Sequence, residues 1–192
     1  ETERKDETDG QDGGKGISAV PGNDYGKLDN TRYGWCFIRK KSNEVPDFPK
    51  REAGLASKYN AIFLGDISQK AVYLTFDEGY ENGYTPHILD VLKNNGVPAA
   101  FFITMPYLRN NFDLVERMIN EGHIVGNHTV NHPSLPELDD DKVEEEVLGL
   151  DRAFTEKTGN SMKYLRPPTG NPERPWIYAC VLELRVCRLG YR

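Results

Sequence analysis

His128 and His132 are two of only four histidines in the chain, and three residues separate them in the stretch Gly-Asn-His-Thr-Val-Asn-His-Pro-Ser. Residues four apart lie on one face of a helical turn, so two imidazoles at this spacing can meet one cation. Imidazole binds zinc, iron, cobalt and nickel, and the pair therefore indicates part of a divalent metal site. The neighbouring asparagines and the proline favour a loop or a single turn, where site residues concentrate.

Two adjacent carboxylates and one arginine extend this chemistry. Asp77 and Glu78 follow an apolar run, and because adjacent side chains diverge, one can bind the metal while the other faces a water molecule. A metal lowers the pKa of its water, and the free carboxylate can then act as general base. Arg166 can hydrogen-bond that base and keep it ionised. Each residue taken alone also has a purely structural interpretation. Asp77 would cap the following turn, and Arg166 would pair with a surface carboxylate.

The elements that must position these residues alternate in type. Short apolar runs predict strands at 71–76, 99–104, 123–125 and 162–165. Helical periodicity predicts helices at 84–95, around 114–119 and at 139–158. Strands with helices between them indicate an α/β fold with a parallel sheet, whose sites gather at the carboxyl ends of the strands. Asp77, the histidine pair and Arg166 all follow predicted strands, so we expect them at one edge.

The remaining histidines and tyrosines have mainly structural interpretations. His123 lies in a predicted strand and is expected to be a core histidine, and His87 in a first helical turn is expected to be solvated. Tyr80 and Tyr84 fit a sugar-binding groove and fit ordinary packing equally well.

Bulk composition excludes several classes of protein. The chain has 192 residues, a net charge of −6 and no arginine-rich stripe, which argues against nucleic-acid binding. No apolar run is long enough to span a bilayer, and the chain, which begins with Glu1, contains no segment with the pattern of a signal peptide. The three cysteines show no Cys-x-x-Cys spacing, so they indicate neither a zinc ribbon nor a disulfide framework.

Three motifs together resemble a known family. Thr75-Phe76-Asp77-Glu78-Gly79, His128-Thr129-Val130-Asn131-His132 and Arg166-Pro167-Pro168-Thr169-Gly170 are similar, in order and spacing, to the first three motifs of the polysaccharide deacetylases, the NodB-homology domain of carbohydrate esterase family four. The longer phrases Phe76–Thr85 and Glu121–Thr129 resemble the branch that deacetylates muramic acid in peptidoglycan, a step toward the cortex of spores.

The resemblance implies a distorted, incomplete (β/α) barrel of the glycoside hydrolase and deacetylase type, and hydrolysis of N-acetyl groups from a cell-wall polysaccharide with release of acetate. It makes Asp77 the general base and Arg166 its orienting partner. It makes Glu78, His128 and His132 the ligands of a divalent metal, expected to be zinc, with cobalt or another transition metal as alternatives. The expected groove residues are Tyr80, Pro167, Pro168, Thr169 and Gly170.

The resemblance also implies an organisation and a location. We expect a disordered or extended arm at 1–32, an extension packing on the barrel at 33–69, a partial deacetylase domain at 70–170 and an atypical tail at 171–192. The expected protein is a monomer, extracellular or associated with the wall of a cell or spore, whose partner is the peptidoglycan glycan strand.

Two departures from the family pattern leave alternatives open. Glu78 stands where the family has an aspartate, and no histidine follows His132 to serve as the family's general acid. The chain is therefore expected to be poorly active alone. A non-catalytic glycan-binding remnant of the fold and a different metal-dependent amidohydrolase are the alternative functions.

Overall fold

The computed structural model describes residues 71–168 continuously, the backbone of 185–186, and single positions at 40, 41, 44, 54, 61, 62, 65 and 68. The predicted arm at 1–32, nearly all of the extension at 33–69 and most of the tail at 171–192 lie outside the described residues. The predicted deacetylase domain is the part that can be compared with the structure.

Five short strands form one parallel sheet, as predicted for an α/β fold. They are β1 (Thr75–Glu78), β2 (Ala100–Ile103), β3 (Ile124–Asn127), β4 (Tyr164–Leu165) and β5 (Arg185–Val186). Their order in the sheet is β1-β2-β3-β4-β5, and each neighbouring pair is parallel. Within the described residues the sheet stays open between β1 and β5, which agrees with the expected incomplete barrel.

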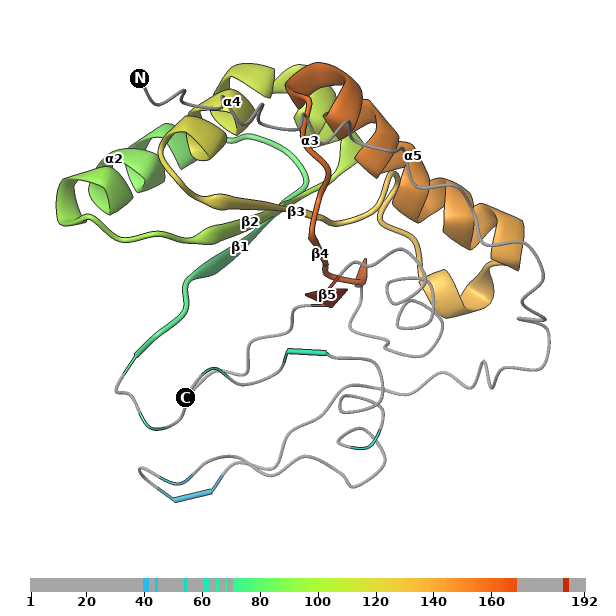
Figure 1. The fold of residues 1–192 in the computed structure, drawn as a ribbon, viewed down its shortest axis with the longest axis horizontal. Helices are drawn as coiled ribbons and strands as arrows, with labels where there is room; N and C mark the ends of the chain where they lie inside the picture. Colours follow the sequence, from blue (N-terminus) through green and yellow to red (C-terminus); the bar gives the residue numbers. More distant parts are fainter. Residues whose placement is uncertain are drawn as a thin grey trace, which may run out of the picture.

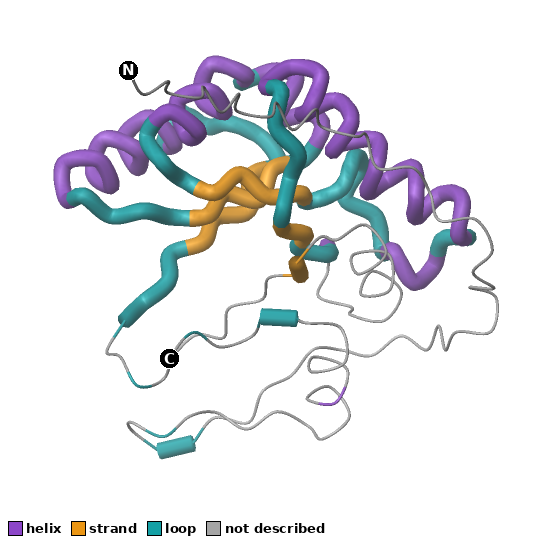
Figure 2. The backbone as a smooth tube through the Cα atoms, in the orientation of Figure 1, coloured by secondary structure: helices purple, strands orange, loops and turns teal. Residues whose placement is uncertain are grey.

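The connections between strands carry the helices α2 (Thr85–Asn95), α3 (Met105–Asn110), α4 (Phe112–Asn120) and α5 (Asp140–Thr158), and a 3₁₀ turn, η2, at Leu135–Glu137. Figures 1 and 2 show α2 to α5 lying along one side of the sheet. Parallel neighbours require such crossovers, because a tight hairpin can join only antiparallel strands. The helices thus follow directly from the strand order.

The register gives the sheet two faces with different chemistry. Phe76, Phe101 and Val125 are lateral neighbours, and they belong to the main hydrophobic core with residues of α2, α4 and α5. Phe76 stacks on Phe101 with 4.9 Å between ring centroids. Alternation along each strand turns Asp77 and Phe102 to the opposite face. This second face, away from the helices, is the one that carries the candidate base.

Helix ends follow the chain's local signals. In α5, the Asp139 side chain accepts a hydrogen bond from the Lys142 backbone N–H at 3.0 Å, as expected for an N-cap. Gly96 and Gly159 end α2 and α5 in the left-handed region, with φ of 62° and 72°. The predicted helices at 84–95 and 139–158 are therefore confirmed to within a residue or so at each end.

Strand boundaries differ more from the expectation. The strand predicted at 71–76 lies at Thr75–Glu78, so Asp77 and Glu78 are paired with Phe102 and Ile103 instead of following the strand. The strand predicted at 123–125 continues to Asn127. The short helix α3 was not predicted, because six residues with a proline near the start give little periodicity.

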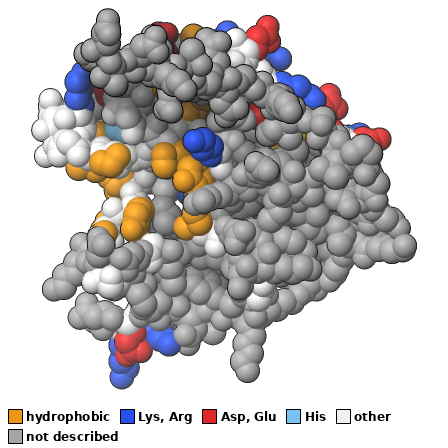
Figure 3. All heavy atoms as spheres, viewed as in Figure 1, with side chains coloured by type: hydrophobic (Ala, Val, Ile, Leu, Met, Phe, Trp, Pro, Cys, Tyr) orange, Lys and Arg blue, Asp and Glu red, His pale blue; other side chains and the backbone are white. Residues whose placement is uncertain are grey.

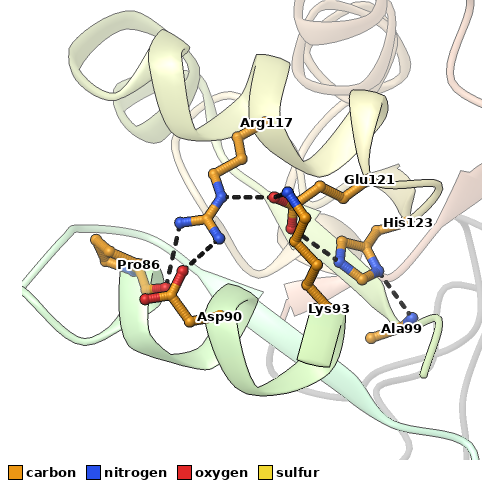
Figure 4. A network of polar contacts seen from close by, with 7 residues as sticks. All are labelled: Pro86, Asp90, Lys93, Ala99, Arg117, Glu121 and His123. Atoms are coloured by element: carbon orange, nitrogen blue, oxygen red, sulfur yellow. Dashed lines mark hydrogen bonds and ion pairs between the residues drawn. The ribbon is translucent and has the colours of Figure 1, made fainter. Parts of the chain in front are cut away.

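His123 is a core histidine, as predicted. It is 8% exposed, its Nδ1 accepts a hydrogen bond from the Ala99 backbone N–H at 3.2 Å, and its Nε2 lies 4.0 Å from Glu121 Oε2. Figure 4 shows Glu121 held in turn by Arg117 and Lys93, so the cluster joins α2, α4 and the start of β3. His87 on α2 is exposed, as predicted.

Several apolar side chains stay at the surface, namely Val72, Tyr73, Leu74, Val97 and Ile124, between 37% and 81% exposed. They belong to the amino ends of β1, β2 and β3 or to the segments just before them. In the view of Figure 3, hydrophobic side chains gather beside a hollow at the left of the molecule. Among the described helices, none is long and apolar enough to cross a membrane.

Candidate active site

The site residues come from the carboxyl ends of three strands. Asp77 lies in the second half of β1, His128 follows β3 directly and Arg166 follows β4 directly. Backbone hydrogen bonds continue past the strands, from His128 N–H to Ile103 O and from Arg166 N–H to Asn127 O, both at 2.9 Å. The predicted gathering of these residues at one edge of the sheet is confirmed for Asp77, His128 and Arg166.

Arg166 and Asp77 form a direct ion pair. Arg166 Nη1 donates to Asp77 Oδ1 at 2.6 Å, and Nη2 donates to Thr75 Oγ1 at 2.9 Å. The guanidinium lies over the Phe102 ring, 4.2 Å from its centroid. Thr75, Asp77 and Phe102 share one face of the sheet, so a single side chain reaches all three. Arg166 can therefore hold the Asp77 carboxylate in one orientation.

Gly126 leaves the space that the Phe102 ring needs beneath the Arg166 guanidinium. A Cβ atom on Gly126 would lie 2.6 Å from atoms of the Phe102 ring and 3.2 Å from the Tyr164 backbone oxygen. These distances leave no room for a side chain between β2 and β4. Phe102 can lie under Arg166 because its neighbour on β3 is a glycine.

His128 is oriented as a metal ligand would be. It is 4% exposed, and its Nδ1 lies 2.7 Å from the Arg166 backbone oxygen. A carbonyl only accepts, so Nδ1 carries the proton and Nε2 keeps its lone pair for another partner. Burial lowers the pKa of His128, with smaller effects from Asp77, Arg166 and His132. The neutral imidazole that metals require is thus the favoured form.

His132 lies beside His128 in a loop. The two rings are 4.8 Å apart between centroids and 70° from parallel. The intervening backbone is not helical, because Thr129 and His132 both have left-handed φ values, 71° and 57°. The rings therefore meet through a tight loop and not through the i, i+4 face of a helix, which agrees with the loop expected from the flanking asparagines and proline.

Glu78 is placed apart from the histidine pair. It follows Asp77 within β1, so its side chain points to the opposite face, the one that carries the helices. Burial, together with the nearby charges of Glu81 and Asp77, raises the pKa of Glu78 to about 7. Glu81 itself accepts hydrogen bonds from Thr85 N–H at 3.3 Å and from Tyr107 Oη at 3.1 Å.

The two imidazoles fit a divalent metal as two of its ligands in donor chemistry. Within the described part of the chain, no three histidine, cysteine, aspartate or glutamate side chains lie close enough together to hold one ion. The structure therefore brings two predicted ligands together and leaves the predicted third, Glu78, beside Glu81.

The predicted groove residues have mixed positions. Tyr80 is 78% exposed, two residues past the end of β1. Pro167 and Pro168 follow Arg166 and are buried. Thr169 and Gly170 lie outside the described residues. Tyr80 is thus the one predicted groove residue, among those described, with a large exposed surface.

Sequence reasoning missed the residues that support the histidine loop. Asn127 is fully buried, and its Oδ1 accepts the Thr129 backbone N–H at 2.8 Å. Glu146 on α5 is 8% exposed and accepts two hydrogen bonds from Asn131. A signal for Glu146 was available, because it stands between Val143, Val147 and Leu150 on the inward face of the helix. A carboxylate in such a position needs a polar partner inside the protein.

Comparison with known proteins shows which family the chain resembles. A family model described as polysaccharide deacetylase matches residues 65–180, somewhat more than the predicted domain at 70–170. An uncharacterised 30.6 kDa protein of Geobacillus stearothermophilus is 47% identical over 137 residues, covering 71% of this chain and 52% of that protein. The peptidoglycan-N-acetylmuramic acid deacetylase PdaA of Bacillus subtilis is 38% identical over 164 residues, covering 85% of this chain and 60% of PdaA.

A third relative, a peptidoglycan-N-acetylglucosamine deacetylase of Bacillus cereus, is 36% identical over 113 residues, or 59% of this chain and 41% of that enzyme. The chain thus spans about half the length of the curated relatives it matches. The solved structure of Bacillus subtilis PdaA, a family 4 carbohydrate esterase, superposes with a TM-score of 0.78 at 37% identity, covering 83% of this chain and 69% of that one. The expected deacetylase type of fold is confirmed, and the chain belongs to the polysaccharide deacetylase family.

Proposed function

We propose that this protein hydrolyses N-acetyl groups of peptidoglycan, most specifically those of N-acetylmuramic acid, and releases acetate. The observation that carries the proposal is the Asp77–Arg166 ion pair on the same edge of the sheet as the His128–His132 pair. Two relatives are named as deacetylases of peptidoglycan N-acetylmuramic acid and of peptidoglycan N-acetylglucosamine, which supports the substrate class. The longer match is to PdaA, which favours muramic acid.

The roles in the reaction follow from the contacts. Asp77 accepts the proton of the attacking water, and Arg166 holds the Asp77 carboxylate toward it. Water adds to the acetamide carbon, the carbon–nitrogen bond breaks, and the products are acetate and the amino sugar. A bound zinc ion would supply Lewis acidity for the carbonyl and lower the pKa of water.

His128 and His132 are the proposed ligands of that zinc, with Glu78 as the third. This assignment requires the Glu78 carboxylate to leave Glu81 and Tyr107 when zinc binds. The test is zinc affinity of Glu78→Gln, with Glu81→Gln as the matched control on the neighbouring carboxylate. A loss confined to Glu78→Gln supports the assignment, whereas unchanged affinity removes Glu78 from the ligand set.

The sugar strand is proposed to lie over Tyr80 and the Pro167–Gly170 turn, beside the catalytic edge. The proposed catalytic domain is 70–170, with the arm, extension and tail as expected from the sequence. A protein acting on peptidoglycan works outside the membrane, so we propose a location at the wall of a cell or spore, as a monomer, with a role in sporulation.

Acetate release from purified peptidoglycan, with added zinc, tests the activity. Mass spectrometry of the digested glycan then shows whether muramic acid or glucosamine has lost the acetyl group. Asp77→Asn and His128→Ala should abolish release, while His87→Ala, which alters an exposed histidine on α2, should leave it unchanged. No acetate from any wall substrate with wild-type protein would refute the proposal.

Glycan binding without turnover is the second candidate. It is favoured by one observation, the placement of Glu78 on the opposite face from Asp77, which leaves the histidine pair without a third ligand among the described residues. Binding of peptidoglycan that does not depend on zinc or on Asp77, with no acetate released, would select this candidate.

A further inference from the structure

The loop that carries the two histidines is held in an unfavourable conformation. Thr129 and His132 both adopt left-handed φ values, 71° and 57°, although neither is a glycine. Such conformations cost of order 1–3 kcal/mol each and persist only where the surroundings determine them. Inside the loop, Thr129 Oγ1 accepts the His132 backbone N–H at 3.1 Å, and contacts from outside the loop can hold it further.

Glu146 makes the contacts that could do so. Its Oε2 accepts the Asn131 backbone N–H at 2.7 Å, and its Oε1 accepts Asn131 Nδ2 at 2.6 Å. Its backbone oxygen accepts the Val130 N–H at 3.0 Å. Glu146 thus accepts hydrogen bonds from Val130 and Asn131, the two residues in the middle of the loop. It does so through both carboxylate oxygens and its backbone carbonyl.

Neighbouring contacts tie the same loop to the same helix. Asn127 Nδ2 donates to the Val147 backbone oxygen at 2.9 Å, and Asn127 Oδ1 accepts the Thr129 N–H at 2.8 Å. Gly149 faces Val130, and a Cβ at Gly149 would lie 3.2 Å from Val130 Cγ2. One short stretch of α5 therefore supports the whole segment between the histidines.

We propose that Glu146 is a positioning residue, which fixes the loop and thereby sets the place of His132 relative to His128. The inference rests on the proposed function in that the pair is taken to bind zinc. Glu146 acts on the histidines through its hydrogen bonds with Asn131 and Val130. Loss of a residue that orients metal ligands typically weakens metal binding about 10- to 100-fold.

Three variants and one control test the role. Glu146→Ala removes both side-chain acceptors. Glu146→Gln keeps an oxygen for the Asn131 N–H, and a flipped Asn131 amide can accept from its new NH₂ group, so it should rescue the loop. Asn131→Ala, at an exposed position, removes one of the two side-chain bonds without disturbing the core.

Asp151→Ala is the matched control. Asp151 is on the same helix and is 7% exposed, and it also accepts from a backbone N–H (Met162, 2.7 Å) and a side chain (Ser161 Oγ, 3.1 Å), but at a different loop. It should destabilise the protein by a comparable amount and leave zinc affinity near that of wild type.

Two measurements are made on the full chain. Zinc affinity, from competition with a chromophoric chelator, should fall about 10- to 100-fold in Glu146→Ala, less in Asn131→Ala, and little in Glu146→Gln. Hydrogen exchange of metal-free protein should show loss of protection at Val130 and Asn131 in Glu146→Ala, a smaller loss in Asn131→Ala, and no loss in Glu146→Gln or Asp151→Ala. The exchange result is independent of catalysis, so absence of acetate release by wild type would refute the proposed function and leave this inference standing.

The inference is overturned if folded Glu146→Ala binds zinc as tightly as wild type, or keeps its exchange protection in the loop. It is also overturned if Asp151→Ala weakens zinc binding equally, because the effect would then reflect stability alone. If Glu146→Ala does not fold, Asn131→Ala decides the question, since unchanged zinc affinity and protection in that variant refute the role.

Discussion

Arg166 Nη1 donates to Asp77 Oδ1 at 2.6 Å, although 89 positions separate the two residues in the chain. The contact joins the first and fourth strands of the sheet on the face away from the helices. The second hydrogen bond of the same guanidinium, from Nη2 to Thr75 Oγ1, fixes its orientation.

Replacing Arg166 by lysine should lower kcat for acetate release. A lysine cannot reach Thr75 and Asp77 together or stack on Phe102, and a shift of about 1 Å at a catalytic group can cost about 10²-fold in rate. Steady-state kinetics of acetate release from soluble peptidoglycan glycan fragments measure the loss. Thr75→Val removes only the second hydrogen bond and should lose less. A kcat of Arg166→Lys equal to wild type would mean that Asp77 needs no orienting partner.

Gly126→Ala should reduce both stability and kcat. The new methyl group would lie 2.6 Å from the Phe102 ring, and overpacking of this kind costs typically about 1–3 kcal/mol. If Phe102 moves, the stacked guanidinium of Arg166 moves with it. Urea unfolding and acetate release, measured on the same preparation, separate the two effects. Full activity in a destabilised Gly126→Ala protein would show that Phe102 does not transmit the change.

Acid should destabilise the protein in two steps. Burial lowers the pKa of His123 from its ordinary 6.5, so the unfolded chain takes up that proton first, and stability falls as pH drops below about 6.5. Arg117 lowers the pKa of Glu121 from its ordinary 4.5, so this contribution is present above that value and is lost as pH falls below it.

Thermal unfolding between pH 7 and pH 3 measures both steps. His123→Asn keeps an acceptor for the Ala99 N–H but cannot titrate, so the first step should be smaller than in wild type. His128, whose pKa burial also lowers, accounts for the part of the step that remains. Glu121→Gln should flatten the second step. The groups that face His123 are Glu121, Arg117 and Lys93, as Figure 4 shows. An unaltered pH profile in His123→Asn would assign the first step to another residue.

Tyr80→Ala should raise KM for oligosaccharides and leave kcat nearly unchanged. Tyr80 is 78% exposed at the catalytic edge, and stacking on an aromatic ring is worth roughly 0.5–1.5 kcal/mol, or about 2- to 12-fold in KM. Tyr73→Ala is the control, because Tyr73 is 51% exposed just before β1, at the opposite edge. Equal changes in the two variants would remove Tyr80 from the groove.

Element types were predictable from the sequence, whereas the ends of strands were not. The apolar run at 71–76 predicted a strand, but Val72 and Leu74 are exposed and pairing with β2 begins at Thr75. Where a strand begins depends on which residues its neighbour can reach, and that is a tertiary effect. The same error hid the orientation of Glu78, because alternation applies to it only once it is inside the strand.

The sequence predicted the candidate catalytic and metal-binding residues of the site. It did not predict the residues that hold them in position. Asp77, Arg166, His128 and His132 could be named from type and spacing. Glu146 and Asn127 act through ordinary hydrogen bonds to backbone groups, which no motif records. The inward position of Glu146 on α5 was the one readable clue.

The strand order has a consequence for synthesis. Each strand of the sheet pairs with the one that precedes it in the chain, so each finds an edge already made as the polypeptide leaves the ribosome. The Asp77–Arg166 bond is different, because it joins β1 to the residue after β4, and these two strands are not neighbours. It can form only after β4 has paired with β3. The base is therefore aligned late, and a nascent chain that has completed only its first three strands has no oriented carboxylate.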